Sequence, residues 1–186
     1  MLDREIGIVH RIVYEDSEYQ EIDIFIGPEK SKAINYICFT GSCMVGDKVL
    51  LNTTAIRLGL GTGGFHYVIA ILREESKVHK KTGHIMKLRY TPLQIAVQTM
   101  EEEGSPYHNS IMDFKSLEML PVISCSLHSM LAPAIAIIKY YMPYSRITYI
   151  MTDGASLPIS MSNSIRDLKN KKLIDNTITY GHAFGG

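Results

Sequence analysis

The sequence predicts an α+β protein with two modules, an N-terminal small β-barrel or curled antiparallel sheet followed by a partial α/β unit with a parallel three-stranded core. One observation is the alternation of polar and apolar residues over residues 6–72, which is typical of strands. The other is the change beyond residue 83, where strand-like and helix-like stretches alternate. We therefore expect a β-rich, barrel-like domain over residues 1–82 and an α/β domain over residues 83–186.

The first module contains five stretches with the pattern of half-buried strands, at residues 6–14, 21–26, 32–39, 48–52 and 65–72. Gly27-Pro28, Gly41-Ser42 and the glycines of residues 59–64 separate them as turns. Five short strands at this spacing predict a small barrel. Residues 74–83 are charged and lack an apolar period, which indicates a surface loop that ends the module.

The glycines of residues 59–64 also satisfy the dinucleotide-binding pattern G-x-G-x-x-G. That fingerprint must follow a strand and open a helix. Residues 65–72 look like another strand, so we predict a turn here rather than a nucleotide site.

The second module begins with a predicted helix and continues as strand, helix, strand, helix, strand. The first helix starts at Thr91-Pro92 and uses Leu93, Val97 and Met100 as its apolar face. The strands are expected at residues 121–126, 146–151 and 176–180, and the later helices at residues 130–141 and after a Ser162 cap. Strands joined by crossover helices are parallel and covered on both faces. Three strands do not complete such a domain, so we expect the chain to be part of a longer protein.

Composition limits the kinds of partner. The chain has 19 Lys plus Arg and 19 Asp plus Glu, and a net charge of zero disfavours nucleic acid or an anionic membrane as the main partner. Cys38, Cys43 and Cys125 have neither disulfide-framework nor zinc-site spacing, which favours a reducing compartment. The sequence shows no signal-peptide layout and no apolar run long enough to span a membrane. We therefore predict a cytoplasmic protein.

Three segments directly follow the predicted parallel strands, at residues 126–129, 152–156 and 181–186. Ligands bind beyond the carboxyl ends of such strands, because loops and helix N-termini converge there. We predict His128, Asp153 and His182 as acid and base groups of a catalytic site. The expected ligand-binding residues are Ser126, Ser129, Thr152, Gly154, Ser156, Gly181 and Gly185, together with Lys87, Arg89 and Thr91.

Three interpretations of these groups stay open. They could form a polar pocket without metal, which we favour, or a facial metal site. Their spacings of 25 and 29 residues match no metal motif, so the sequence identifies no metal and no cofactor. In the third interpretation Asp153 and Ser156 are turn and capping residues, His128 is a hydrogen-bonded core histidine and His182 ends a strand.

Ser129 precedes a predicted helix, where its hydroxyl could cap the helix or act as a nucleophile. We favour capping. The hydrolase elbow requires Gly-x-Ser-x-Gly, which neither Ser129 nor Ser156 satisfies.

Basic residues gather between the modules, and they are Lys77, Lys80, Lys81, Lys87 and Arg89. A barrel beside them is typical of single-strand-binding modules, but the neutral chain favours a solvated loop. Lys87 and Arg89 precede the predicted helix start at Thr91-Pro92, where exposed amides would help them hold a phosphate or carboxylate.

Several motifs resemble the bacterial family known as domain of unknown function 3866. They are residues 50–55 (LLNTTA), 58–64 (LGLGTGG), 83–94 (GHIMKLRYTPLQ), 127–129 (LHS), 151–155 (MTDGA) and 181–186 (GHAFGG). The resemblance covers nearly the whole chain. It implies that the chain is the N-terminal part of a longer protein, because members continue past the final Gly-Gly with an acidic residue and a further histidine-containing segment. It implies no reaction.

These expectations favour a protein that binds a small anionic or phosphorylated metabolite at the strand ends, as an enzyme or a relic of one. The alternative is a noncatalytic interaction or regulatory module that uses the barrel surface, in a homo-oligomer.

Overall fold

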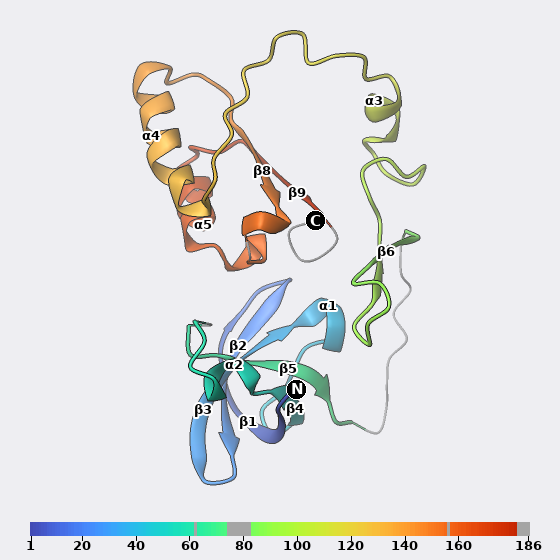
Figure 1. Ribbon diagram of the computed structural model, residues 1–186, viewed down its shortest axis with the longest axis vertical. Coiled ribbons are helices and arrows are strands. Elements are labelled where there is room, and N and C mark those ends of the chain that lie inside the picture. Colours follow the sequence, from blue (N-terminus) through green and yellow to red (C-terminus); the bar gives the residue numbers. More distant parts are fainter. Residues whose placement is uncertain (62, 74–82, 156, 182–186) are drawn as a thin grey trace. The chain divides into compact units, whose positions relative to one another are not determined.

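The structure is a computed structural model that describes residues 1–61, 63–73, 83–155 and 157–181 (Figure 1). The chain divides into two compact units, Met1–Lys80 and Lys81–Gly186. Each unit has its own hydrophobic core, and each is described by itself.

The first unit is a closed barrel of five strands in the order β1-β2-β3-β5-β4. The strands are β1 (Arg4–Glu15), β2 (Tyr19–Ile26), β3 (Glu29–Tyr36), β4 (Lys48–Asn52) and β5 (His66–Ile71). The β3–β5 pair is parallel and the other pairs are antiparallel, with β4 closing the barrel against β1. The predicted barrel is confirmed, because the five strands close on one another around one hydrophobic core.

That core is filled by apolar strand residues and by one loop residue, Cys43; the strand residues are Val9, Ile22, Ile24, Ala33, Val49, Leu51 and Val68. Two fully buried amides sit beside it. Gln20 Oε1 accepts the Cys43 N–H at 2.7 Å and an Asn35 Nδ2–H at 2.9 Å, and Gln20 Nε2 donates to the Cys43 carbonyl at 3.1 Å. Because the buried amides pair with one another and with the backbone, they fix the loop that carries Cys43 without an unpaired group.

Two short helices interrupt the barrel strands, α1 (Ile37–Thr40) and α2 (Thr54–Arg57). The glycine-rich segment follows α2 as a turn, with positive φ at Gly59, Gly63 and Gly64, and leads into strand β5. The predicted turn is confirmed, since the described glycines precede strand β5, whereas the dinucleotide fingerprint precedes a helix.

The second unit begins with a hairpin of β6 (Ile85–Lys87) and β7 (Ile95–Val97), followed by α3 (His108–Met112). The predicted helix from Thr91 to Met100 is therefore wrong. Leu88 and Tyr90 have positive φ and reverse the chain, and Lys87 then pairs with Ile95 across the hairpin. Val97 and its neighbours belong to a strand, because cross-strand pairing overrides a helical spacing of three apolar residues.

The remainder of this unit contains α4 (Leu131–Tyr141), β8 (Thr148–Thr152), α5 (Asn163–Asn170) and β9 (Asn176–Tyr180). β8 and β9 pair in parallel, as expected for strands joined by a crossover helix. The Ser162 hydroxyl caps α5 by accepting the Ile165 N–H at 3.2 Å. The core consists of Leu131, Ile135, Met151, Ile165, Leu168 and Ile174. These four predicted elements are confirmed.

The predicted strand at residues 121–126 is wrong, because this segment forms no strand and all six of its residues are exposed. In the described part of the chain the parallel sheet has two strands, β8 and β9, in place of the three expected. The partial α/β unit is confirmed with this correction.

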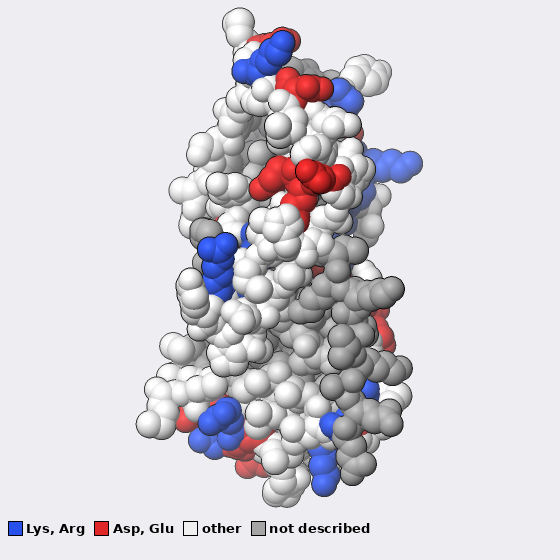
Figure 2. All heavy atoms as spheres, turned by 90° about the vertical axis from the view of Figure 1, so that its right-hand side faces the viewer, with Lys and Arg blue, Asp and Glu red and all other residues white. Residues whose placement is uncertain are grey.

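Among the described residues, every helix is too short or too polar to cross a membrane. On the face that Figure 2 displays, the described charged side chains of both signs form small, separate groups. The charged segment at residues 74–82, with Lys77, Lys80 and Lys81, lies outside the described residues.

Candidate functional site

The carboxyl ends of β8 and β9 lie next to each other, because the parallel register pairs Thr152 with Tyr180. The chain continues from β8 into the short turn η2 (Asp153–Ala155) and from β9 into Gly181. The two segments that the sequence placed at strand ends therefore meet at one edge. Thr152, Asp153 and Gly154 are exposed there.

Gly181 and Asp153 approach so closely that a side chain at position 181 would force the Asp153 carboxylate to move. A Cβ atom added to Gly181 would overlap the Asp153 carboxylate, and the φ of 143° is one that glycine adopts readily. The carboxylate of Asp153 thus lies directly over the backbone of the neighbouring strand end.

Lys87 brings a positive charge to the same place. Its ammonium donates a hydrogen bond to the Gly181 carbonyl, across 94 positions of sequence. Lys87 is the last residue of strand β6, so the β6–β7 hairpin positions its side chain. The strand end therefore combines an ammonium, a carboxylate and a backbone without side chain.

The helix N-terminus that was expected to assist Lys87 and Arg89 does not form, which corrects that part of the prediction. Arg89 is exposed in the turn after β6. Thr91 is exposed in the same turn, where its hydroxyl donates to the Leu88 carbonyl at 2.8 Å and accepts the Leu93 N–H at 3.2 Å. Thr91 thus stabilises a hairpin turn, because its hydroxyl is used locally.

His128 lies in the turn η1 (His128–Met130) and joins three elements of the second unit. Its Nδ1 is 2.9 Å from the Tyr149 hydroxyl on β8, and its Nε2 is 2.7 Å from the Ser162 hydroxyl that caps α5. Burial lowers the pKa of His128 and raises the pKa of Tyr149. With both ring nitrogens paired, these contacts match the structural alternative for His128, and its catalytic role stays a prediction.

The remaining predicted residues are not gathered at one point. Ser126 and Ser129 are exposed, and the Ser126 hydroxyl lies 3.7 Å from the Met130 sulfur. Ser129 was expected to cap a helix, but α4 begins after Met130 and has no side-chain cap. Ser156, His182 and Gly185 lie outside the described residues. Within the described ranges, no group of three His, Cys, Asp or Glu side chains is arranged to hold a metal ion.

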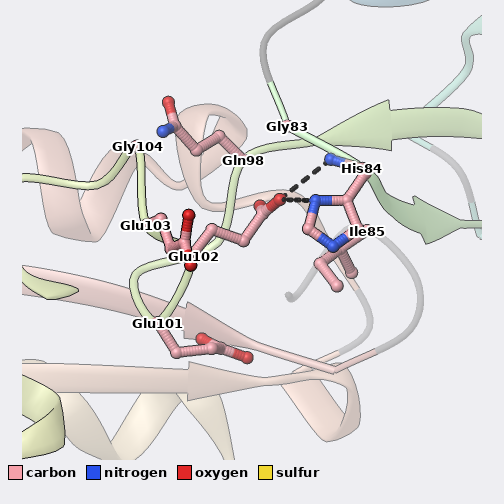
Figure 3. Close-up of a pocket in the computed structure, with 8 residues that line it drawn as sticks. All are labelled: Gly83, His84, Ile85, Gln98, Glu101, Glu102, Glu103 and Gly104. Carbon is pink, nitrogen blue, oxygen red and sulfur yellow. Dashed lines mark hydrogen bonds and ion pairs between the residues drawn. The ribbon is translucent and has the colours of Figure 1, made fainter.

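The structure also contains a hollow that the sequence does not predict, with a volume of about 730 Å³ (Figure 3). Its lining consists of Gly83, His84, Ile85, Gln98, Glu101, Glu102, Glu103 and Gly104. The signal in the sequence is three consecutive glutamates before Gly104. Nothing in the sequence shows that His84 lies opposite them, because the β6–β7 hairpin makes that approach.

Glu102 is the buried member of this hollow and points toward His84 in Figure 3. Its Oε1 accepts the His84 N–H at 2.9 Å and lies 2.5 Å from His84 Nδ1, and its Oε2 accepts the Thr99 N–H at 2.6 Å. Hydrogen bonds from the Thr99 and His84 backbones lower the pKa of Glu102. Glu102 therefore holds the ends of the hairpin together.

Comparison with known proteins identifies a family and nothing more specific. A search of the curated proteins and a search of the solved structures each found no match. The model of the family described as "Protein of unknown function (DUF3866)" matches residues 32–186, which include part of β3, the barrel strands β4 and β5, and the whole second unit. Because this match covers more than half of the sequence, the chain belongs to the DUF3866 family.

Proposed function

We propose that the protein binds a small anionic or phosphorylated metabolite at the carboxyl ends of β8 and β9. The observation that supports this is the Lys87 ammonium on the Gly181 carbonyl, at the edge of a parallel sheet where ligands usually bind. An ammonium positioned by a backbone carbonyl keeps further N–H donors for a phosphate or carboxylate oxygen.

In this proposal the residues next to Lys87 contact different parts of the ligand. Gly154 has no side chain, so a ligand can approach the backbone there, while the Gly181 backbone is covered by the Asp153 carboxylate. The Asp153 carboxylate accepts hydrogen bonds only, which suits a hydroxyl or amino group on the ligand and disfavours a phosphate at that point. The ligand class that fits both ends is a phosphorylated or carboxylated compound with a hydroxyl or amine a few atoms away. Arg89, from the same hairpin turn, supplies a second cation in this proposal.

Any catalysis at this place would use Asp153 together with the predicted His182. Asp153 could exchange a proton with a hydroxyl group that lies against it. His128 in this proposal acts through Ser162 and Tyr149, by holding the turn before α4 and the start of α5 in position.

The test is a binding measurement by calorimetry with inorganic phosphate and a panel of phosphorylated sugars. Lys87→Met keeps the length of the side chain and removes its charge, and we expect it to weaken binding about tenfold to a hundredfold. Lys169→Met, on the exposed side of α5, is the matched control and should leave affinity unchanged. Equal affinity in the wild type and Lys87→Met, or no binding of any anion, would refute the proposal.

A second candidate is the interaction module, and it has its own supporting observation. Ile6 and Ile8 on the outer face of β1 are 56% and 47% exposed, and they pair with Leu50 and Phe25 of the neighbouring strands. An apolar strip of this kind on a barrel suits docking of a protein partner. If a purified partner binds the wild type and the Ile6→Lys, Ile8→Lys variant equally well, this candidate fails.

We also propose that the protein works in the reducing cytoplasm of bacteria. Cys38, Cys43 and Cys125 are free thiols, and two of them are exposed, which suits a reducing compartment. Fractionation of the native cells tests this, and recovery of the protein from an oxidising compartment would contradict it.

A further inference from the structure

The chain segment before α4 exposes an unusual amount of apolar surface. Ten large apolar side chains between Tyr107 and Leu127 are exposed, and Val122 and Ile123 are 74% and 64% exposed. Burying one side chain of this kind removes roughly 80 Å² of apolar surface from water, so the ten together expose on the order of 800 Å² per chain. Burial of all ten would reach about the area that one partner contributes to a stable protein interface, and Val122 and Ile123 are the two that lie within residues 121–126.

The backbone of residues 121–126 is uncovered as well. None of its N–H or carbonyl groups forms a backbone hydrogen bond with another described residue. The sequence Pro-Val-Ile-Ser-Cys-Ser carries two adjacent β-branched residues and no helix-forming pattern. The segment therefore has the composition of a β-strand, and its backbone N–H and carbonyl groups are available for pairing with another strand.

The sheet of the second unit has a strand edge whose backbone groups are unpaired among the described residues. β8 pairs with β9 on one side, and among the described residues no strand pairs with its other side. Two-stranded sheets are marginal, and parallel sheets are normally covered on both faces. On β8, Met151 is fully buried, but Ile150 on the opposite face is 58% exposed. An additional strand at the β8 edge would extend the sheet to three strands.

The two surfaces are also compatible in charge. Residues 119–127 and β8 contain no Lys, Arg, Asp or Glu, so no charge would be desolvated when they meet.

In the structure the segment does not pair with the sheet of its own chain, although the chain carries both the strand and the edge. In two copies, the segment of each chain can therefore pair with the β8 edge of the other. The two contacts are then identical, as a two-fold dimer requires.

We propose that residues 121–126 of one chain pair with the free edge of β8 in a second copy of the chain, and that the exchange is reciprocal. The result is a dimer in which each second unit contains a three-stranded sheet, with the additional strand supplied by the partner. This dimer is independent of ligand binding at the strand ends.

The test measures the mass of the full chain in solution by light scattering across a wide concentration range, together with hydrogen exchange. We expect a mass of twice 20.9 kDa and slow exchange of the amides of residues 122–126 in the dimer. Ser124→Pro removes a ladder N–H and Ile123→Lys buries a charge, and each should weaken the dimer at least tenfold. Both positions are exposed in the single chain, so its fold should be retained.

Ile137→Lys is the matched control, because Ile137 is an equally exposed isoleucine on α4. A dimer that is lost in Ile123→Lys and kept in Ile137→Lys supports the proposal. A mass of 20.9 kDa at every concentration overturns it, and slow exchange of residues 122–126 in that monomer would show pairing within one chain. A dimer that both variants weaken equally, or that neither weakens, also overturns it.

Discussion

At the scale of single residues, His128 links the pH of the solution to the stability of the second unit. Its ring nitrogens contact Tyr149 and Ser162, and burial lowers its pKa below the ordinary value of 6.5. The unfolded chain therefore binds a proton at a higher pH than the folded chain does. The neutral imidazole therefore makes its full contribution to the free energy of unfolding above pH 6.5. That contribution decreases as the pH falls from 6.5 through the lower pKa of the folded state.

We predict that the free energy of unfolding of the second unit falls as the pH is lowered from 8 to about 5. His128→Gln should flatten this dependence, because glutamine does not titrate there. Urea unfolding followed by circular dichroism at several pH values measures the effect. His66 in the barrel also has a pKa lowered by burial, so the comparison must be the difference between wild type and variant. Identical pH slopes would show that His128 is not the group responsible.

Gly181 allows a second prediction at this scale. Gly181→Ala should destabilise the second unit by about 1–3 kcal/mol, since alanine is strained at a positive φ and its Cβ would overlap the Asp153 carboxylate. Gly154→Ala is the matched control, because the one described atom that its Cβ would meet is the Thr152 hydroxyl, at an ordinary 3.5 Å. Denaturant unfolding compares the two. A Gly154→Ala cost as large as that of Gly181→Ala would mean that the strand ends tolerate no side chain at all.

At the scale of elements, sequence patterns succeeded where burial alternates along one segment. Strands β2 and β4 follow a period of two through Ile22 and Ile24 and through Val49 and Leu51, and α5 follows a helical period through Ile165 and Leu168 after its Ser162 cap, so these elements were predictable. The residues at 91–100 and 121–126 were misassigned, because their conformation depends on pairing with distant strands or on its absence.

The candidate site was predictable only in part for the same reason. Asp153 and Gly181 follow strands whose parallel pairing could be expected, so their proximity follows from topology. Lys87 reaches Gly181 across 94 positions, and Glu102 reaches His84 through a hairpin that the sequence did not indicate. A local pattern contains no information about such contacts, because they depend on how separate elements pack.

At the scale of the whole molecule, the division into two domains at residues 82 and 83 is a proposal that expression of the parts can test. All eight buried residues of the barrel core come from one stretch of chain, from Val9 to Val68, and the strand order closes without any later residue. A domain with its own core and closed hydrogen bonding is expected to fold alone.

We therefore predict that residues 1–82, expressed separately, unfold cooperatively and retain the far-ultraviolet circular dichroism of a β-protein. A two-residue change at the buried amides, Gln20→Ala with Asn35→Ala, should abolish that cooperative transition or lower its midpoint, because it leaves the Cys43 amide and carbonyl without partners. If the isolated fragment shows no cooperative unfolding while the full chain does, the barrel depends on the second unit. In that case the family match over residues 32–186 would mark one cooperative structure that extends across both units.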